Sequence, residues 1–219
     1  MLRAMLSLIM ALTIVLTAAD VVAETDVHAS SPAPATIEEP APVPSQWVLA
    51  VMREAIPASS QKQSVYFTYD ETATAIAEAA STHPIFAGRA GAVKTAALLL
   101  AIAYYESSFD PKAIGDGHAS FGLYQIQPPT VKYGEGVPGI PEMGNFAMTA
   151  NVLLLPRDAS LVALSLIKTS LRVCGAFPWH ERLGWYAAGK NGCQEKGRKV
   201  SVSRMLLAEK FVREHPVTP

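Results

Sequence analysis

Hydrophobic residues recur along most of the chain at intervals of three and four positions, the spacing of one face of an α-helix. This pattern predicts helices over residues 46–56, 70–81, 88–108, 158–173, 178–188 and 200–214. A weak strand signal lies in the stretch 64–68, which is rich in β-branched and aromatic residues. We therefore predict a mainly α fold.

The third of these helices differs from the others because its stretch from Thr95 to Tyr105 carries no charge. A helix that is apolar on every side is buried in a soluble protein, so this helix is predicted to lie at the centre of the fold. Asp158 is predicted to cap the helix that follows it. Residues 120–126 predict a short helix or turn, and the Gly- and Pro-rich residues 132–147 an irregular loop.

The N-terminus is typical of an export signal. Arg3 is followed by an uncharged, mostly apolar run from Ala4 to Ala19, which is shorter than the roughly 20 residues of a membrane-spanning helix. Small residues favour cleavage after Ala23, with cleavage after Ala19 as the alternative. We predict a signal peptide over 1–23 and export to the periplasm or cell envelope; an uncleaved signal would tether the protein to the membrane.

Two further segments follow the predicted signal. Residues 24–45 are rich in Pro and Ala and predict a disordered linker. Residues 46–219 are then expected to form the folded domain, because a chain of 219 residues suits one domain with accessory segments.

The charge balance gives no indication of a nucleic-acid partner. Lys and Arg number 18 against 19 Asp and Glu, and 50% of the residues are hydrophobic, enough for a sizeable core. The basic residues 196–199 form a short cluster that predicts a solvated loop. The two cysteines, Cys174 and Cys193, predict a disulfide in an exported protein. No His stands at ligand spacing from them, so we expect neither a metal site nor a cofactor.

Glu106 is the acid that ends the uncharged run of the predicted central helix. Burial disfavours a carboxylate, and so does the negative end of the helix dipole. Both effects favour the protonated form, which a general acid needs near neutral pH. The alternative is a carboxylate that turns to solvent where the helix ends.

Three motifs follow one another in the sequence. Glu106 begins the run Glu-Ser-Ser-Phe-Asp-Pro-Lys-Ala-Ile, Ser120 begins Ser-Phe-Gly-Leu-Tyr-Gln-Ile-Gln-Pro, and Tyr186 begins Tyr-Ala-Ala-Gly. In order and spacing they resemble the motifs of the lytic transglycosylase, or SLT, domain, over residues 86–192. The resemblance implies a goose-type, lysozyme-like helical fold with a sugar-binding cleft, and peptidoglycan glycan strands as the partner.

The resemblance also implies a role for individual residues. Glu106 matches the catalytic acid, Gln125 a polar group beside the reacting sugar, and Tyr186 a hydroxyl near the acid. Ser107 matches a residue that steadies the loop below the acid, and Ser120 is expected to bind substrate with the others. The alternatives are an amide at Gln125 that braces its own loop and a plain core aromatic at Tyr186.

The implied reaction breaks the β-1,4 bond between N-acetylmuramic acid and N-acetylglucosamine. Glu106 would protonate the leaving oxygen and then take the proton of the sugar's own 6-hydroxyl, which leaves a 1,6-anhydro end. Gly122 is expected to let the backbone approach a ligand closely. The chain departs from the family pattern at Gly115, where a Ser is usual, and at Ala187, where an Asn is usual.

Asp116 leaves a second activity open. The sequence around it is also similar to goose-type lysozymes, in which an acid at this offset positions water, so Asp116 and Glu106 would form an inverting muramidase. Against this, Gln127 stands where those enzymes can have a further Asp, and Asp116-Gly117 is a common turn dipeptide. An inactive wall-binding module on the same fold is a third hypothesis.

Overall fold

The computed structural model describes residues 39–56, 63–134 and 146–217. The predicted signal peptide, most of the predicted linker and most of the loop predicted over 132–147 lie outside the described residues.

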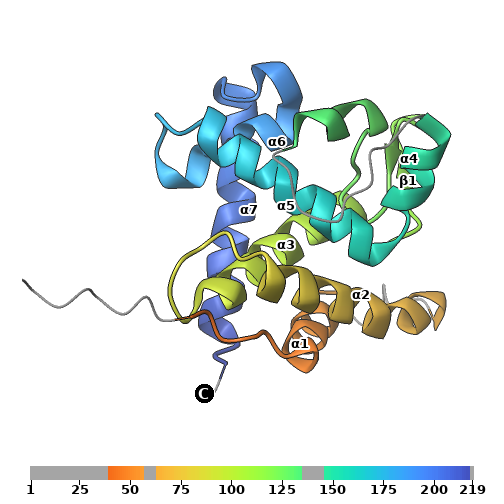
Figure 1. The fold of residues 1–219 in the computed structure, drawn as a ribbon, viewed down its shortest axis with the longest axis vertical. Helices are drawn as coiled ribbons and strands as arrows, with labels where there is room; N and C mark the ends of the chain where they lie inside the picture. The colour runs from red at the N-terminus through yellow and green to blue at the C-terminus, as the bar shows by residue number, and fades with distance from the viewer. Residues whose placement is uncertain (1–38, 57–62, 135–145, 218–219) are drawn as a thin grey trace, which may run out of the picture. The chain divides into compact units, whose positions relative to one another are not determined.

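The described chain is mainly helical, which confirms the predicted fold class (Figure 1). Its elements, in chain order, are α1 (Ser45–Ala55), α2 (Gln63–Thr82), α3 (Gly91–Ser107), β1 (Ile114–Gly115), β2 (Ser120–Phe121), η2 (Pro128–Tyr133), α4 (Phe146–Leu153), α5 (Pro156–Val173), η3 (Trp179–Glu181), α6 (Gly184–Ala188), η4 (Gly189–Asn191) and α7 (Glu195–Glu214).

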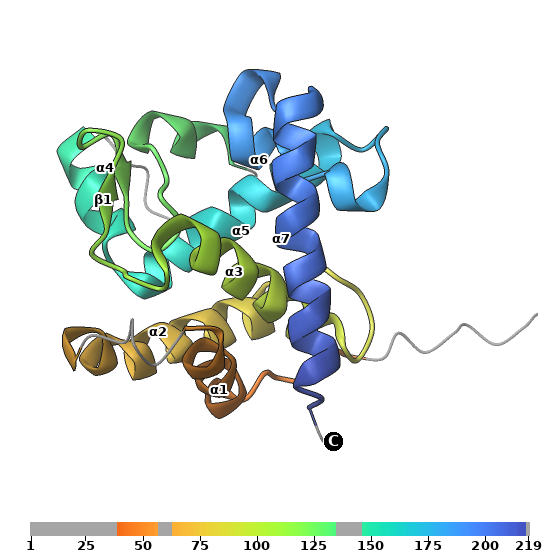
Figure 2. The same cartoon turned by 180° about the vertical axis from the view of Figure 1, so that it is seen from behind.

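Helix α3 forms the centre of the core, as its uncharged sequence predicts. Its residues 95–103 are all buried, and the helix contacts α1, α2, α5 and α7 (Figure 2). A helix packed against neighbours on all sides has no solvent-exposed face that needs polar residues, so the apolar sequence of α3 agrees with its central position. Beyond this buried stretch, Lys94 in the first turn and Tyr105 in the last turn are exposed, and the acid Glu106 lies on that last turn.

The residues just before α1 lie against the same core. The backbone N–H of Ala41 donates to the carbonyl of Arg89 at 3.2 Å, and that of Val43 donates to Ser81 Oγ at 2.9 Å. Val43 is buried. The chain is therefore held to the domain a few residues before the expected boundary at Ser45.

Two sequence predictions are wrong near helix starts. Residues 64–68 belong to α2 and not to a strand. The β preference of a short run is worth at most about 1 kcal/mol, and continuation of a helix that buries Tyr69, Ala73 and Ile76 outweighs it. Asp158 lies in the first turn of α5 rather than at its cap, because Pro156 already begins the helix.

The C-terminal helix begins earlier than its hydrophobic pattern suggests. α7 starts at Glu195, so the basic cluster 196–199 forms its first turn and not a loop. An ion pair of 2.7 Å between Lys199 Nζ and Glu195 Oε1 supports this turn. The helix predicted over 178–188 is divided into η3 and α6.

A small hairpin follows α3 and shapes the region around the second motif. β1 and β2 are antiparallel, with Gly115 opposite Ser120, and a further bridge joins Phe121 to Ile126. Residues 120–126 are thus a strand and a turn rather than a helix. Among the described helices, none alone is long and apolar enough to cross a membrane; α4 and α5 reach that threshold only as a pair, bent by 101°.

Candidate active site

A cleft of about 750 Å³ lies beside the C-terminal end of α3. All three motifs contribute to it: Glu106 from the first, Ser120 and Gln125 from the second, and Tyr186 from the third. The hairpin turn adds Asp116. The remaining described wall comes from η2, α5 and α6, with Thr130, Tyr133, Leu166, Thr169, Arg172, Val173 and Trp185 among its residues. Residues far apart in the sequence therefore meet in one hollow, which is large enough for a sugar ring.

Helix α3 ends in a left-handed turn that directs the acid. Ser108 and Phe109 have φ angles of 52° and 65°. The N–H of Ser108 donates to the carbonyl of Tyr104 at 3.1 Å, and that of Phe109 to the carbonyl of Ala103 at 3.4 Å. These bonds close the helix, and the buried Phe109 anchors the turn in the core. The last turn, with Glu106, is thereby fixed rather than frayed.

Ser107 connects this helix end to the second motif. Its Oγ donates to the carbonyl of Leu123 at 2.8 Å. This contact agrees with the steadying role that the resemblance implies. Ser107 does not line the cleft, so its place is behind the site rather than against a sugar.

Arg204 forms an ion pair with Glu106, a contact that the sequence did not predict. Its Nη2 donates to Glu106 Oε1 at 2.5 Å, and the side chains are 11% and 21% exposed. The sequence argument left Glu106 without a counter-charge, whereas α7 supplies one. A signal did exist: Arg204 falls on the buried face of α7, between Ser201 and Ala208, and a charge on such a face needs a buried partner.

The second carboxyl in the cleft is held by its own hairpin. Asp116 has a φ angle of 50°, and Gly117 continues the left-handed turn with 61°. Ser120 Oγ donates to Asp116 Oδ2 at 2.5 Å. The structure thus gives Asp116 the turn position that its dipeptide predicts, and also places it in the wall of the cleft.

Backbone strain in the described chain is concentrated around the cleft. Five residues other than glycine have positive φ angles: Ser108, Phe109, Asp116, His118 and Gln125. All of them lie between the end of α3 and the end of the second motif. Such conformations cost about 1 kcal/mol or more each, and they persist where the surrounding structure enforces them. This concentration is typical of a functional site.

Gln125 is positioned by two backbone carbonyls. Its Nε2 donates to the carbonyl of Gly122 at 3.0 Å and to that of Ala113 at 3.2 Å. The amide therefore braces its loop, as the alternative interpretation expected, and it lines the cleft as well. A Cβ at Gly115 would lie 2.2 Å from Gln125 Oε1, so the glycine at the family's Ser position makes room for this amide.

Gly122 has a different role from the one expected. Its φ angle is 72°, and a Cβ there would lie 1.8 Å from the carbonyl oxygen of Leu153. The close approach is to the end of α4 and not to a ligand, and Gly122 does not line the cleft.

Tyr186 brings the third motif next to the acid. Its hydroxyl donates to the carbonyl of Tyr124 at 3.2 Å, and its N–H donates to Ser170 Oγ at 3.0 Å. Burial raises the pKa of Tyr186 well above its usual range; the charge of Glu106 raises it further, and Arg204 opposes the shift. The phenol is therefore a neutral hydrogen-bond donor beside the carboxylate.

Tyr124 is a packed aromatic. The side chain is buried, and its hydroxyl lies 3.0 Å from Ser160 Oγ. Burial raises the pKa of Tyr124 above its usual range, and the hydrogen bond with Ser160 works against that rise.

The predicted disulfide is confirmed. Cys174, at the end of α5, is bonded to Cys193, which lies just before α7. The bond closes a loop that contains α6 and therefore Tyr186. The disulfide thereby fixes the part of the cleft wall that α6 contributes.

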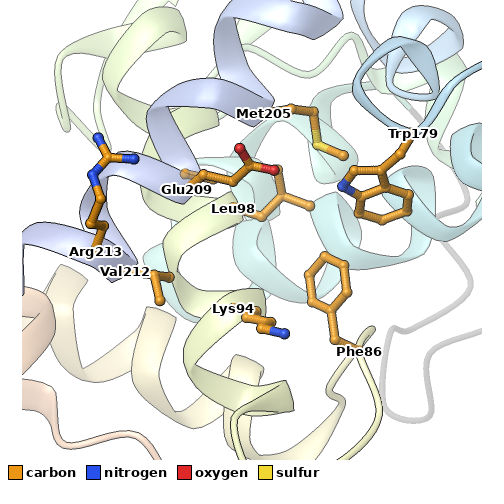
Figure 3. A pocket seen from close by; sticks show the side chains of 9 residues that line it. Phe86, Lys94, Leu98, Trp179, Met205, Glu209, Val212 and Arg213 are labelled. Carbon is orange, nitrogen blue, oxygen red and sulfur yellow. The ribbon is translucent and has the colours of Figure 1, made fainter. Parts of the chain in front are cut away.

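A second hollow, of about 520 Å³, has mainly apolar walls, with the charged side chains of Lys94, Glu209 and Arg213 among its lining residues (Figure 3). Phe86 and Trp179 meet edge to face there, with 5.4 Å between their ring centroids. Its one carboxyl, Glu209, is already bonded to His180 Nε2 at 2.8 Å. All three motifs line the cleft at Glu106, and we assign the chemistry to it. Within the described residues, no three His, Cys, Asp or Glu side chains are grouped so as to hold a metal ion.

Comparison with known proteins identifies one family. The profile of the transglycosylase SLT domain matches residues 85–204, which is more than half of the chain and includes all three motifs and Arg204. Neither the curated proteins nor the solved structures gave a match. The cleft, its acid and this match lead to one conclusion: the chain belongs to the SLT family of peptidoglycan lytic transglycosylases, glycan-cleaving enzymes of the cell envelope.

Proposed function

We propose that the protein cleaves the β-1,4 bond between N-acetylmuramic acid and N-acetylglucosamine and leaves a 1,6-anhydro end. Glu106 acts first as the general acid and then as the general base. The glycan strand occupies the cleft beside the end of α3, with Gln125 and Tyr186 in its wall.

One observation supports this choice above the others. Among the described residues that line the cleft, two carry carboxyl groups, Glu106 and Asp116. Asp116 accepts a short hydrogen bond from Ser120 within its own turn. Glu106 Oε1 accepts a hydrogen bond from Arg204, and Glu106 Oε2 has no hydrogen-bond partner among the described residues. Asp116 Oδ1 likewise has no hydrogen-bond partner among the described residues, but Glu106 alone stands at the position of the family's catalytic acid. This favours a reaction that needs one acid, with the substrate's own hydroxyl as nucleophile.

The reaction balances without water. The proton of Glu106 moves to the glycosidic oxygen, and the bond from that oxygen to C1 of the muramic residue breaks, its electron pair going to the oxygen. The 6-hydroxyl oxygen of the same residue forms a bond to C1, and its proton returns to Glu106. Because the nucleophile belongs to the sugar being cleaved, the step is intramolecular and gains from proximity.

A hydrolase is the second candidate function because Asp116 lines the same cleft. In that reaction Asp116 would take a proton from a water molecule, and the product would carry a reducing end. The two reactions differ by one water in the mass of each product.

Product analysis tests the proposal. Purified peptidoglycan is digested with the protein and with Glu106→Gln, and the soluble fragments are analysed by mass spectrometry. We expect anhydro ends from the parent and far fewer fragments from the variant. Reducing ends would favour the hydrolase, and equal digestion by the variant would contradict the assignment of Glu106.

We also propose that the protein acts after export. The substrate lies outside the cytoplasm, and a disulfide between Cys174 and Cys193 persists in an oxidising compartment. N-terminal sequencing of the protein recovered from the cell envelope is expected to begin at Glu24. A sequence that begins at Met1 would instead indicate a retained membrane tether.

A further inference from the structure

Arg204 lies outside the cleft and contacts it through Glu106. The described lining residues include Glu106 but not Arg204, so a sugar in the cleft meets the carboxyl and not the guanidinium. The two side chains come from the last turn of α3 and from the middle of α7. Arg204 can therefore influence the reaction through the carboxyl that it holds, and its charge also acts on the neighbouring Tyr186.

The guanidinium is itself fixed in place. Nη1 donates to the carbonyl of Val200 at 3.2 Å, and the group lies over the ring of Tyr105, 5.4 Å from its centroid. Together with the hydrogen bond from Nη2 to Glu106, these contacts restrain the guanidinium. An arginine fixed in this way is pre-organised, so it gives a definite direction to the carboxyl that it binds.

We infer that Arg204 is a positioning residue that binds Glu106 Oε1 and leaves Oε2 as the oxygen that exchanges the proton with the substrate. This inference rests on the proposed function. The cation is opposite in charge to the carboxylate that exists between the two halves of the reaction, and it is in place before that charge develops.

The pairing has a consequence for pH dependence. The guanidinium is the cation in contact with the group that exchanges the proton. Its loss should therefore change how the reaction rate depends on pH. The other titratable groups that face the cleft from neighbouring elements are Tyr186 on α6, Asp116 in the hairpin turn, Tyr124 in the second motif, Tyr133 on η2 and Arg172 on α5.

The main test is a pH profile of kcat/KM on purified glycan strands. In Arg204→Gln we expect the alkaline limb to differ from that of the parent, because the acid has lost the charge that contacts it. The maximal rate should fall, because the developing charge on Glu106 loses its partner. Arg204→Lys keeps the charge and should keep the alkaline limb near that of the parent.

Arg198 offers a matched control on the same helix. It forms a partly buried ion pair with Glu181 at 2.8 Å, and neither residue lines the cleft. Arg198→Gln therefore loses a comparable ion pair without touching Glu106, and its alkaline limb should coincide with that of the parent. If Arg204→Gln also coincides with the parent, Arg204 is merely structural and the inference is overturned. If the parent itself yields no anhydro ends, the proposed function fails instead.

A second measurement covers the case of a poorly folded variant. The thermal midpoints of the parent, Arg204→Gln, Glu106→Gln and the double variant form a cycle. We expect Arg204→Gln to lower the midpoint more in the parent than in the Glu106→Gln background, because the cation then loses no carboxylate. Equal losses in both backgrounds, including failure of both to fold, would show that Arg204 acts independently of Glu106 and would overturn the inference.

Discussion

The end of α3 and the β1–β2 turn each place a carboxyl in the same cleft, but they hold it differently. Glu106 is bound by Arg204, 98 positions later in the chain. Asp116 is bound by Ser120, four positions later. The local bond of Asp116 needs only its hairpin, whereas the charge of Glu106 is compensated only when α7 packs on α3. The acid proposed for catalysis thus depends on the whole fold, and the other acid does not.

The largest expected effect is at Glu106. Glu106→Gln retains the size of the side chain and can still accept from Arg204, but it has no proton to give. We expect the cleavage rate to fall about 10³-fold, within the usual range for loss of a general acid. Fragment release from purified peptidoglycan measures this, and the thermal midpoint checks that the variant is folded. A rate close to that of the parent would remove the proposed difference between the two acids.

The next effect concerns the phenol beside Glu106. Because the pKa of Tyr186 is raised in the folded protein, the folded state keeps this proton above about pH 10, where the unfolded chain releases it. The contribution to stability is present below that pH and is lost as pH rises, by up to about 1.4 kcal/mol per pH unit for one proton.

Urea unfolding at several pH values between about 9 and about 11 measures this loss, because that range spans the pKa of about 10 expected for a free phenol. Tyr186→Phe should show a shallower fall than the parent, and Glu106→Gln a slightly shallower one, since the carboxylate contributes to the raised pKa of Tyr186. Identical slopes in the parent and Tyr186→Phe would contradict the burial of this phenol.

A smaller effect is expected at Gly115, directly before Asp116. In Gly115→Ala the new Cβ would displace the amide of Gln125 from the carbonyls of Ala113 and Gly122. We expect a stability loss of about 1 kcal/mol, the usual size for a lost hydrogen bond. In a Gln125→Ala background the same substitution should cost little. An equal cost in both backgrounds would mean that the collision with Gln125 is not the reason for the glycine.

The smallest effect is expected at Asp116. In Asp116→Asn the amide oxygen can still accept from Ser120, so the turn should persist. We expect the cleavage rate to change by less than about threefold, roughly 0.6 kcal/mol. A fall as large as that of Glu106→Gln would show that both acids take part, and it would favour the hydrolase.

The sequence predicts the parts of the site that depend on local pattern. The uncharged run of α3 predicts its burial, and the acid that ends this run lines the cleft. The Asp-Gly dipeptide predicts its turn, and the cysteine pair predicts its disulfide. Each of these features is set by residues close in the chain or by composition.

Other features depend on contacts that a sequence pattern does not contain. Arg204 has the spacing of an ordinary helix residue, and only the packing of α7 on α3 brings it to Glu106. The left-handed conformations of Phe109 and Gln125 are enforced by surrounding contacts, because neither residue prefers them. The close approach of Gly122 to Leu153 likewise arises from packing. The strand predicted over 64–68 failed because a local preference was weaker than the continuation of α2.

Digestion of peptidoglycan in water enriched in heavy oxygen tests most directly whether one carboxyl is sufficient. If Glu106 alone transfers the proton and the sugar's own hydroxyl closes the ring, the new ends contain no label and are anhydro, in the parent and in Asp116→Asn alike. Label at C1 of the parent's products would show that water attacks that carbon, and it would contradict the account.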